Sequence, residues 1–367
     1  MNKTQLSAMP ESLSAIKKDR LKKISLDPVA TAKAAQLKYV SHSDEGIRRI
    51  KTGKTFTYKL RNKTIKNKEE LQRIRSLVLP PAWEDVWICV QPNGHLQATG
   101  KDIKGRKQYR YHPLWSQLRN HTKFYRMYEL GKVLPRIRRQ IQEDLALPGL
   151  PKNKVLATVI SLMEKTGIRI GNEFYEKLYG SFGLTTLKDK HVNIKGGRIK
   201  FTFRGKKGVE HQISLQSKKL SAIVHQCRDI PGKELFQYID EEGERRSIES
   251  GMVNDYIRNI ADGEFTAKDF RTWCGSVAAL IAIKETGIVE TKKEAKQKIM
   301  EVLDKVSFQL GNTRTVCKKY YVHPHLLEIY ENGEIEKWLG KMNNDKKTSE
   351  AELLVEEKIF MDILESL

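Results

Sequence analysis

The chain has 367 residues, with 67 lysines and arginines against 45 aspartates and glutamates, a formal net charge of +22. This excess predicts nucleic acid as a partner, because lysine and arginine side chains that neutralise phosphates dominate sequence-independent DNA binding; a ribosome-associated basic protein is the alternative. No run of 18 apolar residues occurs, so no membrane span is expected, and the four widely spaced cysteines disfavour structural zinc and a disulfide framework.

The first 125 residues are expected to hold an arm and a β-rich domain. Residues 1–35 are polar and basic, lack the apolar segment of a secretory signal, and are predicted to form a basic N-terminal arm. Residues 36–125 are predicted to form a β-rich DNA-binding domain, with a hairpin that turns at Pro92–Gly94. Basic, amide and aromatic side chains then interleave in GRKQYRYHPLW, at 105–115.

From about residue 126 the pattern turns helical, and residues 126–331 are predicted to form a mainly helical catalytic domain. Three short strands interrupt it in HVNIKGGRIKFTFRGKKGVEHQISL, with glycine turns between them. Helix N-caps are expected at Thr266 and Thr291. Residues 332–367 are expected to form a polar linker and an acidic amphipathic helix. The fold class is therefore α+β.

The segment LGNTRTVCKKYYVHP, at 310–324, places Tyr320 and Tyr321 after polar and basic residues. A tyrosine flanked by cations is suited to attack a phosphodiester and to hold the product as a phosphotyrosine. Such a transfer also needs positive charge at the non-bridging oxygens and a proton donor for the leaving oxygen. No carboxylate cluster indicates a metal, so guanidinium groups, which match phosphate oxygens and keep their protons, are expected to supply the charge.

Four residues are candidates for the remaining parts of such a site. Arg169 lies among apolar neighbours in GIRIGN, and Arg271 follows Lys268 by three residues on a predicted helix. Lys206 stands between glycines at a hairpin tip, from which it can reach into a groove and donate a proton. Asn312 can donate a neutral hydrogen bond to a phosphate oxygen.

Each candidate also has an ordinary structural interpretation. Paired tyrosines usually pack against a core, and Arg169 is also suited to a buried ion pair. Lys206 is also suited to a solvated turn, Arg271 to a DNA-backbone contact, and Asn312 to a helix cap. The two histidines of VHPHL lack a third ligand, so no metal site is expected there.

Together these segments resemble the type IB DNA topoisomerases, in particular their bacterial and poxvirus-like branch, over roughly residues 40–330. YRYHPLW resembles the DNA-contacting end of the family's N-terminal domain. Four segments resemble the family's catalytic domain and occur in the family's order, namely GIRIGNEFY, FGLTTLKDKHV, FRGKKG and FTAKDFRTW. LGNTRTVCKKYYVHP resembles the segment that bears the nucleophile.

The resemblance implies roles by position. Arg169 and Arg271 would be the catalytic arginines, Lys206 the general acid, and Tyr321, rather than its neighbour, the nucleophile. Asn312 stands where viral and eukaryotic members have histidine, a departure that bears on rate and pH dependence. Five further residues match positions that contact DNA or lie near the scissile phosphate, namely Gln108, Tyr109, Tyr111, Tyr175 and Lys268.

The implied activity is relaxation of positive and negative supercoils in double-stranded DNA. One strand is transiently cleaved and religated through a 3′-phosphotyrosyl intermediate, with neither ATP nor a metal cofactor. A monomer is implied, and we expect it in the cytoplasm, on the nucleoid if the source is bacterial.

Two alternatives remain open. A tyrosine recombinase or integrase shares the chemistry and the helical catalytic fold. That family usually has His-x-x-Arg where this chain has Lys268-x-x-Arg271, and it usually carries a helical core-binding domain where residues 36–125 look β-rich. A non-catalytic DNA-binding protein of the same fold is disfavoured by the intact set of arginines, lysine and tyrosine.

Overall fold

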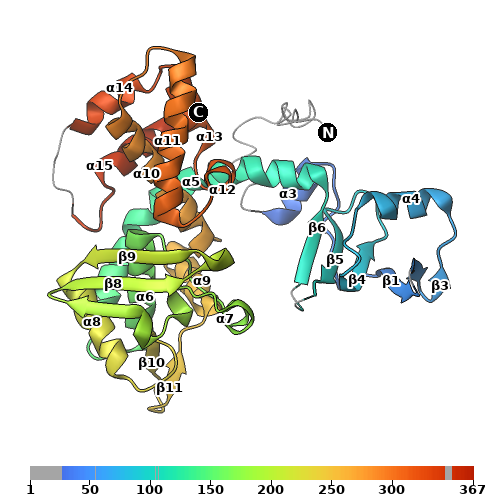
Figure 1. Cartoon of the computed structure of the whole chain (residues 1–367), viewed down its shortest axis with the longest axis horizontal. Coiled ribbons are helices and arrows are strands. Elements are labelled where there is room, and N and C mark those ends of the chain that lie inside the picture. Colours follow the sequence, from blue (N-terminus) through green and yellow to red (C-terminus); the bar gives the residue numbers. More distant parts are fainter. Residues whose placement is uncertain (1–26, 54, 104, 106, 344–348) are drawn as a thin grey trace. The chain divides into compact units, whose positions relative to one another are not determined.

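The computed structural model describes residues 27–53, 55–103, 105, 107–343 and 349–367. Most of the expected basic arm thus lies outside the described residues, and its last part forms helix α3 (Pro28–Ala34). The chain divides into two compact units, Met1–Arg126 and Met127–Leu367 (Figure 1). The mixture of sheets and helices confirms the predicted α+β class. No described helix is long and apolar enough to cross a bilayer.

The first unit contains a six-stranded antiparallel sheet in the order β3-β2-β1-β4-β5-β6. Strands β4 and β5 form the hairpin predicted around Pro92–Gly94. Helix α4 (Lys68–Ser76) contributes Ile74 to the apolar core of the sheet. The strand bounds are β1 Gly46–Thr52, β2 Thr55–Leu60, β3 Lys63–Thr64, β4 Glu84–Cys89, β5 Leu96–Lys101 and β6 Lys107–Tyr111.

Helical structure begins earlier than the sequence analysis predicts. Helix α5 runs over Pro113–Asp144, so the start expected near residue 126 is wrong. Pro113 occupies the first helical position, where its missing N–H removes no intrahelical hydrogen bond and its fixed φ suits the helix. Trp115 and Leu118 are buried against α3 and the residues after it, so the start of α5 belongs to the first unit.

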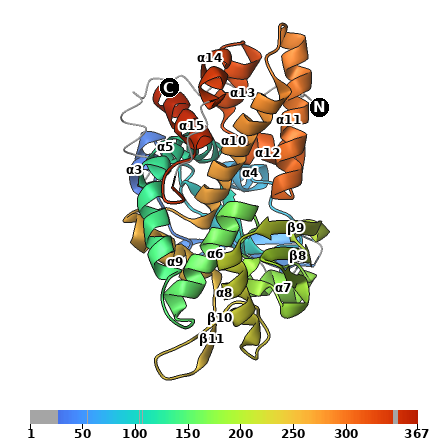
Figure 2. The ribbon, with the colours of Figure 1, turned by 90° about the vertical axis from the view of Figure 1, so that its left-hand side faces the viewer.

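The second unit is mainly helical and is organised around α10 (Ala267–Thr286). This helix packs against α6, α9, α11, α13 and α15 (Figure 2). The bounds are α6 Lys152–Thr166, α7 Glu173–Tyr179, α8 Lys218–Asp229, α9 Ser250–Ala261, α11 Lys292–Leu310, α12 Arg314–Tyr320, α13 Pro324–Glu331, α14 Glu336–Leu339 and α15 Val355–Glu365. Strands β10 (Gln237–Ile239) and β11 (Arg245–Ser247) form a small hairpin.

The predicted three-stranded insert is present as the antiparallel sheet β7-β8-β9 (Val192–Lys195, Arg198–Arg204 and Glu210–Gln216). Both helix caps predicted in this unit are confirmed as well. The N–H of Thr266 donates to Asp269 at 2.9 Å in a capping box, and the N–H of Glu294 donates to the Thr291 hydroxyl at 3.2 Å.

The segment after Tyr330 is packed into the second unit. Part of the stretch expected as a polar connection forms α14, whose Trp338 and Leu339 are buried. The predicted acidic helix is present as α15, and its apolar face, which includes Phe360 and Ile363, is buried as well. Apolar side chains spaced three or four residues apart in a mostly polar segment produce this burial.

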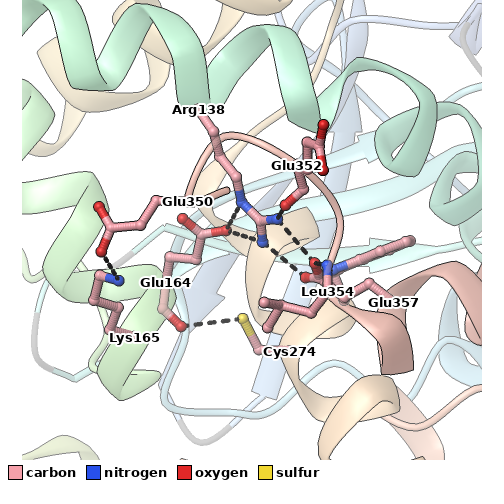
Figure 3. Close-up of polar contacts among 9 residues, drawn as sticks. Arg138, Glu164, Lys165, Cys274, Glu350, Glu352, Leu354 and Glu357 are labelled. Atoms are coloured by element: carbon pink, nitrogen blue, oxygen red, sulfur yellow. Dashed lines mark hydrogen bonds and ion pairs between the residues drawn. The ribbon is translucent and has the colours of Figure 1, made fainter. Parts of the chain in front are cut away.

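A buried ion cluster ties α15 to α5, α6 and α10 (Figure 3). The Arg138 guanidinium donates to Glu164 at 2.6 Å and to both carboxylate oxygens of Glu357 at 2.8 Å. Trp273 Nε1 also donates to Glu357, at 2.8 Å. Burial disfavours the charged guanidinium, but the two carboxylates outweigh it and raise the pKa of Arg138 above its ordinary value.

Substituting Glu357→Gln is expected to destabilise the protein by about 3 kcal/mol, because it removes one charge from a buried ion cluster. Chemical denaturation monitored by circular dichroism measures this free energy of unfolding. Asp362→Asn, on the same helix, is the matched control, since its pairing with Lys341 at 3.7 Å is half exposed and is worth at most about 1 kcal/mol. Equal effects of the two substitutions would contradict the buried-cluster explanation.

Candidate active site

Tyr321 follows α12 directly, and its backbone rests on α10. A Cβ on Gly275 would lie 2.6 Å from the Tyr321 carbonyl oxygen, so the close approach requires glycine. The hydroxyl of Ser276 donates to the same carbonyl at 3.2 Å and accepts from the N–H of His323 at 3.0 Å. These contacts fix the position of the tyrosine backbone on α10, one turn after Arg271.

The C-terminal end of α11 brings the two candidate arginines together. Arg271 Nη2 donates to the carbonyl of Leu310 at 2.9 Å. Arg169 Nη2 lies 3.4 Å from the carbonyl of Gly311 and donates to Asn312 Oδ1 at 2.5 Å. The last carbonyls of a helix lack intrahelical partners and carry partial negative charge. They therefore offset the repulsion between two neighbouring guanidinium groups.

Tyr321, rather than Tyr320, shares this cluster. The Arg271 guanidinium carbon lies 5.2 Å from the centroid of the Tyr321 ring. A side-chain hydrogen bond to Tyr321 is one of the interactions that favour the charged form of Arg169. The ring of Tyr320 instead lies 5.3 Å from the ammonium of Lys319.

Arg271 has unused hydrogen-bonding capacity. Its side chain is buried, with an exposed fraction of 5%, yet Nε and Nη1 have no hydrogen-bond partner among the described residues. A buried donor left without a partner costs about 1–3 kcal/mol, more when it is charged. A phosphate oxygen placed beside Arg271 could accept from Nε or from Nη1, in the charge-assisted contact that guanidinium groups make with phosphates.

The pKa shifts reflect cations that lie close together in a buried site. Burial, followed by repulsion from Arg271 and opposed by Tyr321, lowers the pKa of Arg169 to about 10. Lys206 lies in the tight turn between β8 and β9. Desolvation, followed by the charge of Arg169, lowers its pKa below the ordinary lysine value. A lysine with a lowered pKa gives up its proton more readily, as a general acid must.

Three of the five candidate DNA contacts lie on β6 in the first unit. Gln108 donates to Asp102 at 2.9 Å. Tyr109 and Tyr111 are exposed, and their rings are stacked, with centroids 6.0 Å apart and planes 8° apart. Exposed aromatic rings beside cations such as Lys107 suit contact with a nucleic acid.

The other two candidate contacts lie in the second unit. Tyr175 is exposed on α7, with its ring 6.0 Å from that of Tyr179. Lys268 is exposed in the first turn of α10, and its charge contributes to the lowered pKa of Lys206. Tyr175 and Lys268 therefore belong to the same unit as the arginine cluster.

One residue at this site was missed by the sequence analysis. His211, on β9, is buried, and its pKa is lowered by burial and then by the charges of Arg169 and Arg271. In the structure, His211 pairs with Phe203 on the buried face of the β8–β9 hairpin. The alternation of apolar residues along β8 is the one signal in the sequence that such a face exists. Nothing local in the sequence indicates its proximity to Gly311, which comes from a different element.

A helical unit with a hairpin insert, two clustered arginines, a lysine and a tyrosine matches the class of enzymes that transfer phosphodiesters through tyrosine. Residues 112–349 match the family described as eukaryotic DNA topoisomerase I, catalytic core. Residues 55–102 match the bacterial DNA topoisomerase IB N-terminal domain. The chain belongs to the type IB DNA topoisomerase family, as its sequence motifs predicted.

Viral proteins are among the similar relatives. DNA topoisomerase 1B of Acanthamoeba polyphaga mimivirus is 33% identical over 300 residues, which cover 79% of this chain and 89% of that protein. DNA topoisomerase I of monkeypox virus is 26% identical over 238 residues, covering 64% and 72% of the two chains. DNA topoisomerase 1B of vaccinia virus (strain Copenhagen) is 25% identical with the same coverage.

Proposed function

We propose that this protein relaxes positive and negative supercoils in double-stranded DNA by cleaving and religating one strand, and that Tyr321 is the nucleophile. The observation that carries the proposal is the buried Arg271. Its guanidinium carbon lies 5.2 Å from the centroid of the Tyr321 ring, and two of its donors have no hydrogen-bond partner among the described residues. A backbone phosphate is an anion that both suits these donors and contains the bond to be broken.

In the proposed reaction, the Tyr321 oxygen attacks the phosphorus and gives up its phenolic proton to solvent. The arginines and Asn312 bind the non-bridging oxygens as negative charge develops on them. The bond from phosphorus to the 5′ oxygen breaks, and Lys206 protonates that oxygen. The 3′-phosphotyrosyl diester keeps the bond energy, so the 5′ hydroxyl reverses the step after the duplex has rotated, without ATP or metal.

DNA contacts from both units complete the proposal. The stacked tyrosines of β6, together with Gln108, are proposed to contact the duplex from a DNA-binding domain of residues 36–125. Tyr175 and Lys268 are proposed to do so from a catalytic domain of residues 126–331. We propose that the protein acts as a monomer, since Arg169, Arg271 and Tyr321 meet within the second unit alone, and that it acts in the cytoplasm.

Relaxation of a supercoiled plasmid in EDTA without ATP tests the function. The protein is expected to relax both positively and negatively supercoiled plasmid, which agarose gel electrophoresis resolves. Tight DNA binding without relaxation would contradict the proposal and favour a non-catalytic DNA-binding protein. Strand exchange between two specific sites, without general relaxation, would favour a tyrosine recombinase.

Lys206→Ala is expected to slow cleavage on the order of 100- to 10,000-fold, the range typical of a lost general acid. The deficit should shrink on a substrate with a 5′-bridging phosphorothiolate, because its thiolate leaving group needs no proton. Rapid-quench measurement of the covalent adduct gives both rates. Lys207→Ala, in the same turn, is the matched control, and an equal deficit on both substrates would remove the general-acid role.

A further inference from the structure

His211 is the second residue of β9 and lies close to the turn of the β8–β9 hairpin. Its imidazole stacks on the opposite residue, Phe203, with centroids 4.9 Å apart and planes 11° apart. Only 8% of His211 is exposed, and it is the only buried residue of β9. Stacking and burial together hold the ring in one orientation.

The imidazole ring packs against two glycines that lie in different parts of the chain. A Cβ on Gly205 would lie 2.6 Å from Cδ2 and Nε2 of the imidazole. A Cβ on Gly311 would overlap its Cε1 atom. Gly205 immediately precedes Lys206, and Gly311 immediately precedes Asn312. A single imidazole is therefore packed between the turn that carries the proton donor and the loop that carries a phosphate-binding candidate.

The ring lies within the electric field of the arginine cluster. Burial and the charges of Arg169 and Arg271 all lower its pKa, which favours the neutral form. A neutral ring fits between two backbone segments without adding a further cation beside two guanidinium groups. The imidazole of His211 therefore acts by packing within the site, since the edges of the ring face the backbone of two glycines.

We propose that His211 is a positioning residue that holds the Lys206 turn against the Asn312 loop. The proton donor and the phosphate-binding groups can then contact the same phosphate. The inference rests on the proposed function and adds a residue to which no role in the reaction is assigned above. Loss of the ring leaves the turn free to move away from the loop. Misplacement of a catalytic group by about 1 Å can cost a factor on the order of 100 in rate.

Cleavage by His211→Ala is the first test. We expect the rate on an ordinary phosphodiester to fall roughly 10- to 100-fold. On the 5′-bridging phosphorothiolate substrate we expect most of the loss to be recovered, because that substrate does not depend on the position of Lys206. An unchanged rate on the ordinary substrate would overturn the proposal, as would an equal loss on both substrates.

His191→Ala is the matched control for a purely structural histidine. His191 is also 8% exposed and lies against a phenylalanine ring, Phe182, at 4.3 Å. The charges that act on its pKa come from Lys190, Lys188 and Glu176, not from the arginine cluster. Loss of either histidine is expected to lower Tm, but His191→Ala should show no selective recovery on the phosphorothiolate. Selective recovery in His191→Ala as well would overturn the proposal.

A second variant, Gly205→Ala, keeps the His211 ring and tests the contact itself. Gly205 has φ −95°, which any residue adopts, so Gly205→Ala acts by pressing a methyl group on the imidazole. Cleavage should fall roughly 10-fold in the single variant, and adding His211→Ala should cause no further loss beyond that of His211→Ala alone. Losses that simply multiply would overturn the proposal.

Failure of this inference is separable from failure of the proposed function. If wild type forms no covalent adduct with DNA, the proposed function fails. If wild type cleaves and Lys206→Ala recovers on the phosphorothiolate, the proposed function stands. In that case, an unchanged rate in His211→Ala, or an equal loss on both substrates, overturns only the role of His211.

Discussion

Tyr321→Phe is expected to lose all covalent adduct formation and plasmid relaxation while binding duplex DNA as wild type does. The substitution removes one hydroxyl and keeps the ring that lies 5.2 Å from the Arg271 guanidinium. Loss of a nucleophile elsewhere reduces turnover on the order of a million-fold, so cleavage should fall to background. A gel-shift titration beside a denaturing gel of the adduct separates binding from chemistry.

Tyr320→Phe provides the matched control for Tyr321→Phe. Tyr320 is the adjacent residue, carries the same hydroxyl, and has its ring beside Lys319 rather than beside an arginine. It should keep wild-type adduct formation. Loss of the adduct in Tyr320→Phe alone would show that the neighbouring tyrosine is the nucleophile and that Tyr321 has been assigned wrongly.

Arg271→Met is expected to reduce cleavage about 100- to 1,000-fold, the usual consequence of losing a preorganised donor to a developing oxyanion. The same substitution should leave thermal stability unchanged or slightly raised. Two of the donors in Arg271 are buried without a partner among the described residues, and methionine removes that desolvation penalty. A fall in activity without a fall in Tm is typical of a residue that is retained for function at the expense of stability.

Two further arginine variants test whether the effect of Arg271→Met is specific to the guanidinium at this position. Arg271→Lys should recover little activity, because an ammonium lacks the planar fork of N–H groups with which a guanidinium contacts phosphate oxygens. Arg246→Met, at an exposed arginine paired with Asp240, should change neither rate nor Tm. A large loss of stability in Arg271→Met would assign the residue a structural role instead, and wild-type cleavage would remove it from the site.

Local signals were enough for the elements that carry the candidate site. Glycines at both ends of the Lys206 turn predicted the hairpin, and Thr266 with Asp269 predicted the start of α10. The start of α5 is also available locally in Pro113, but the prediction extends the β-rich region past the end of β6 to residue 125. The sequence does not show that the carbonyls at the end of α11 hold both arginines, because that requires three elements to pack together.

The contributions of His211 and Glu357 could not be predicted from the sequence for the same reason. Each is an ordinary residue in its own strand or helix, and each matters through partners that lie far away in the sequence. His211 packs against Gly311, and Glu357 binds Arg138, more than 200 positions earlier. Amphipathic periodicity predicts the helix that carries Glu357 but not the helix against which it docks.

The buried cluster around Glu357 also imposes an order on maturation. Trp273, whose indole is bound by Glu357, stands two residues after Arg271 on α10. Because a ribosome makes the chain from its N-terminus, α15 emerges after the tyrosine, both arginines and the lysine have been made. A nascent chain with every candidate catalytic side chain thus still lacks the carboxylate that anchors α10. The hydrogen bond from Trp273 to Glu357 therefore forms only after every candidate catalytic residue has been synthesised.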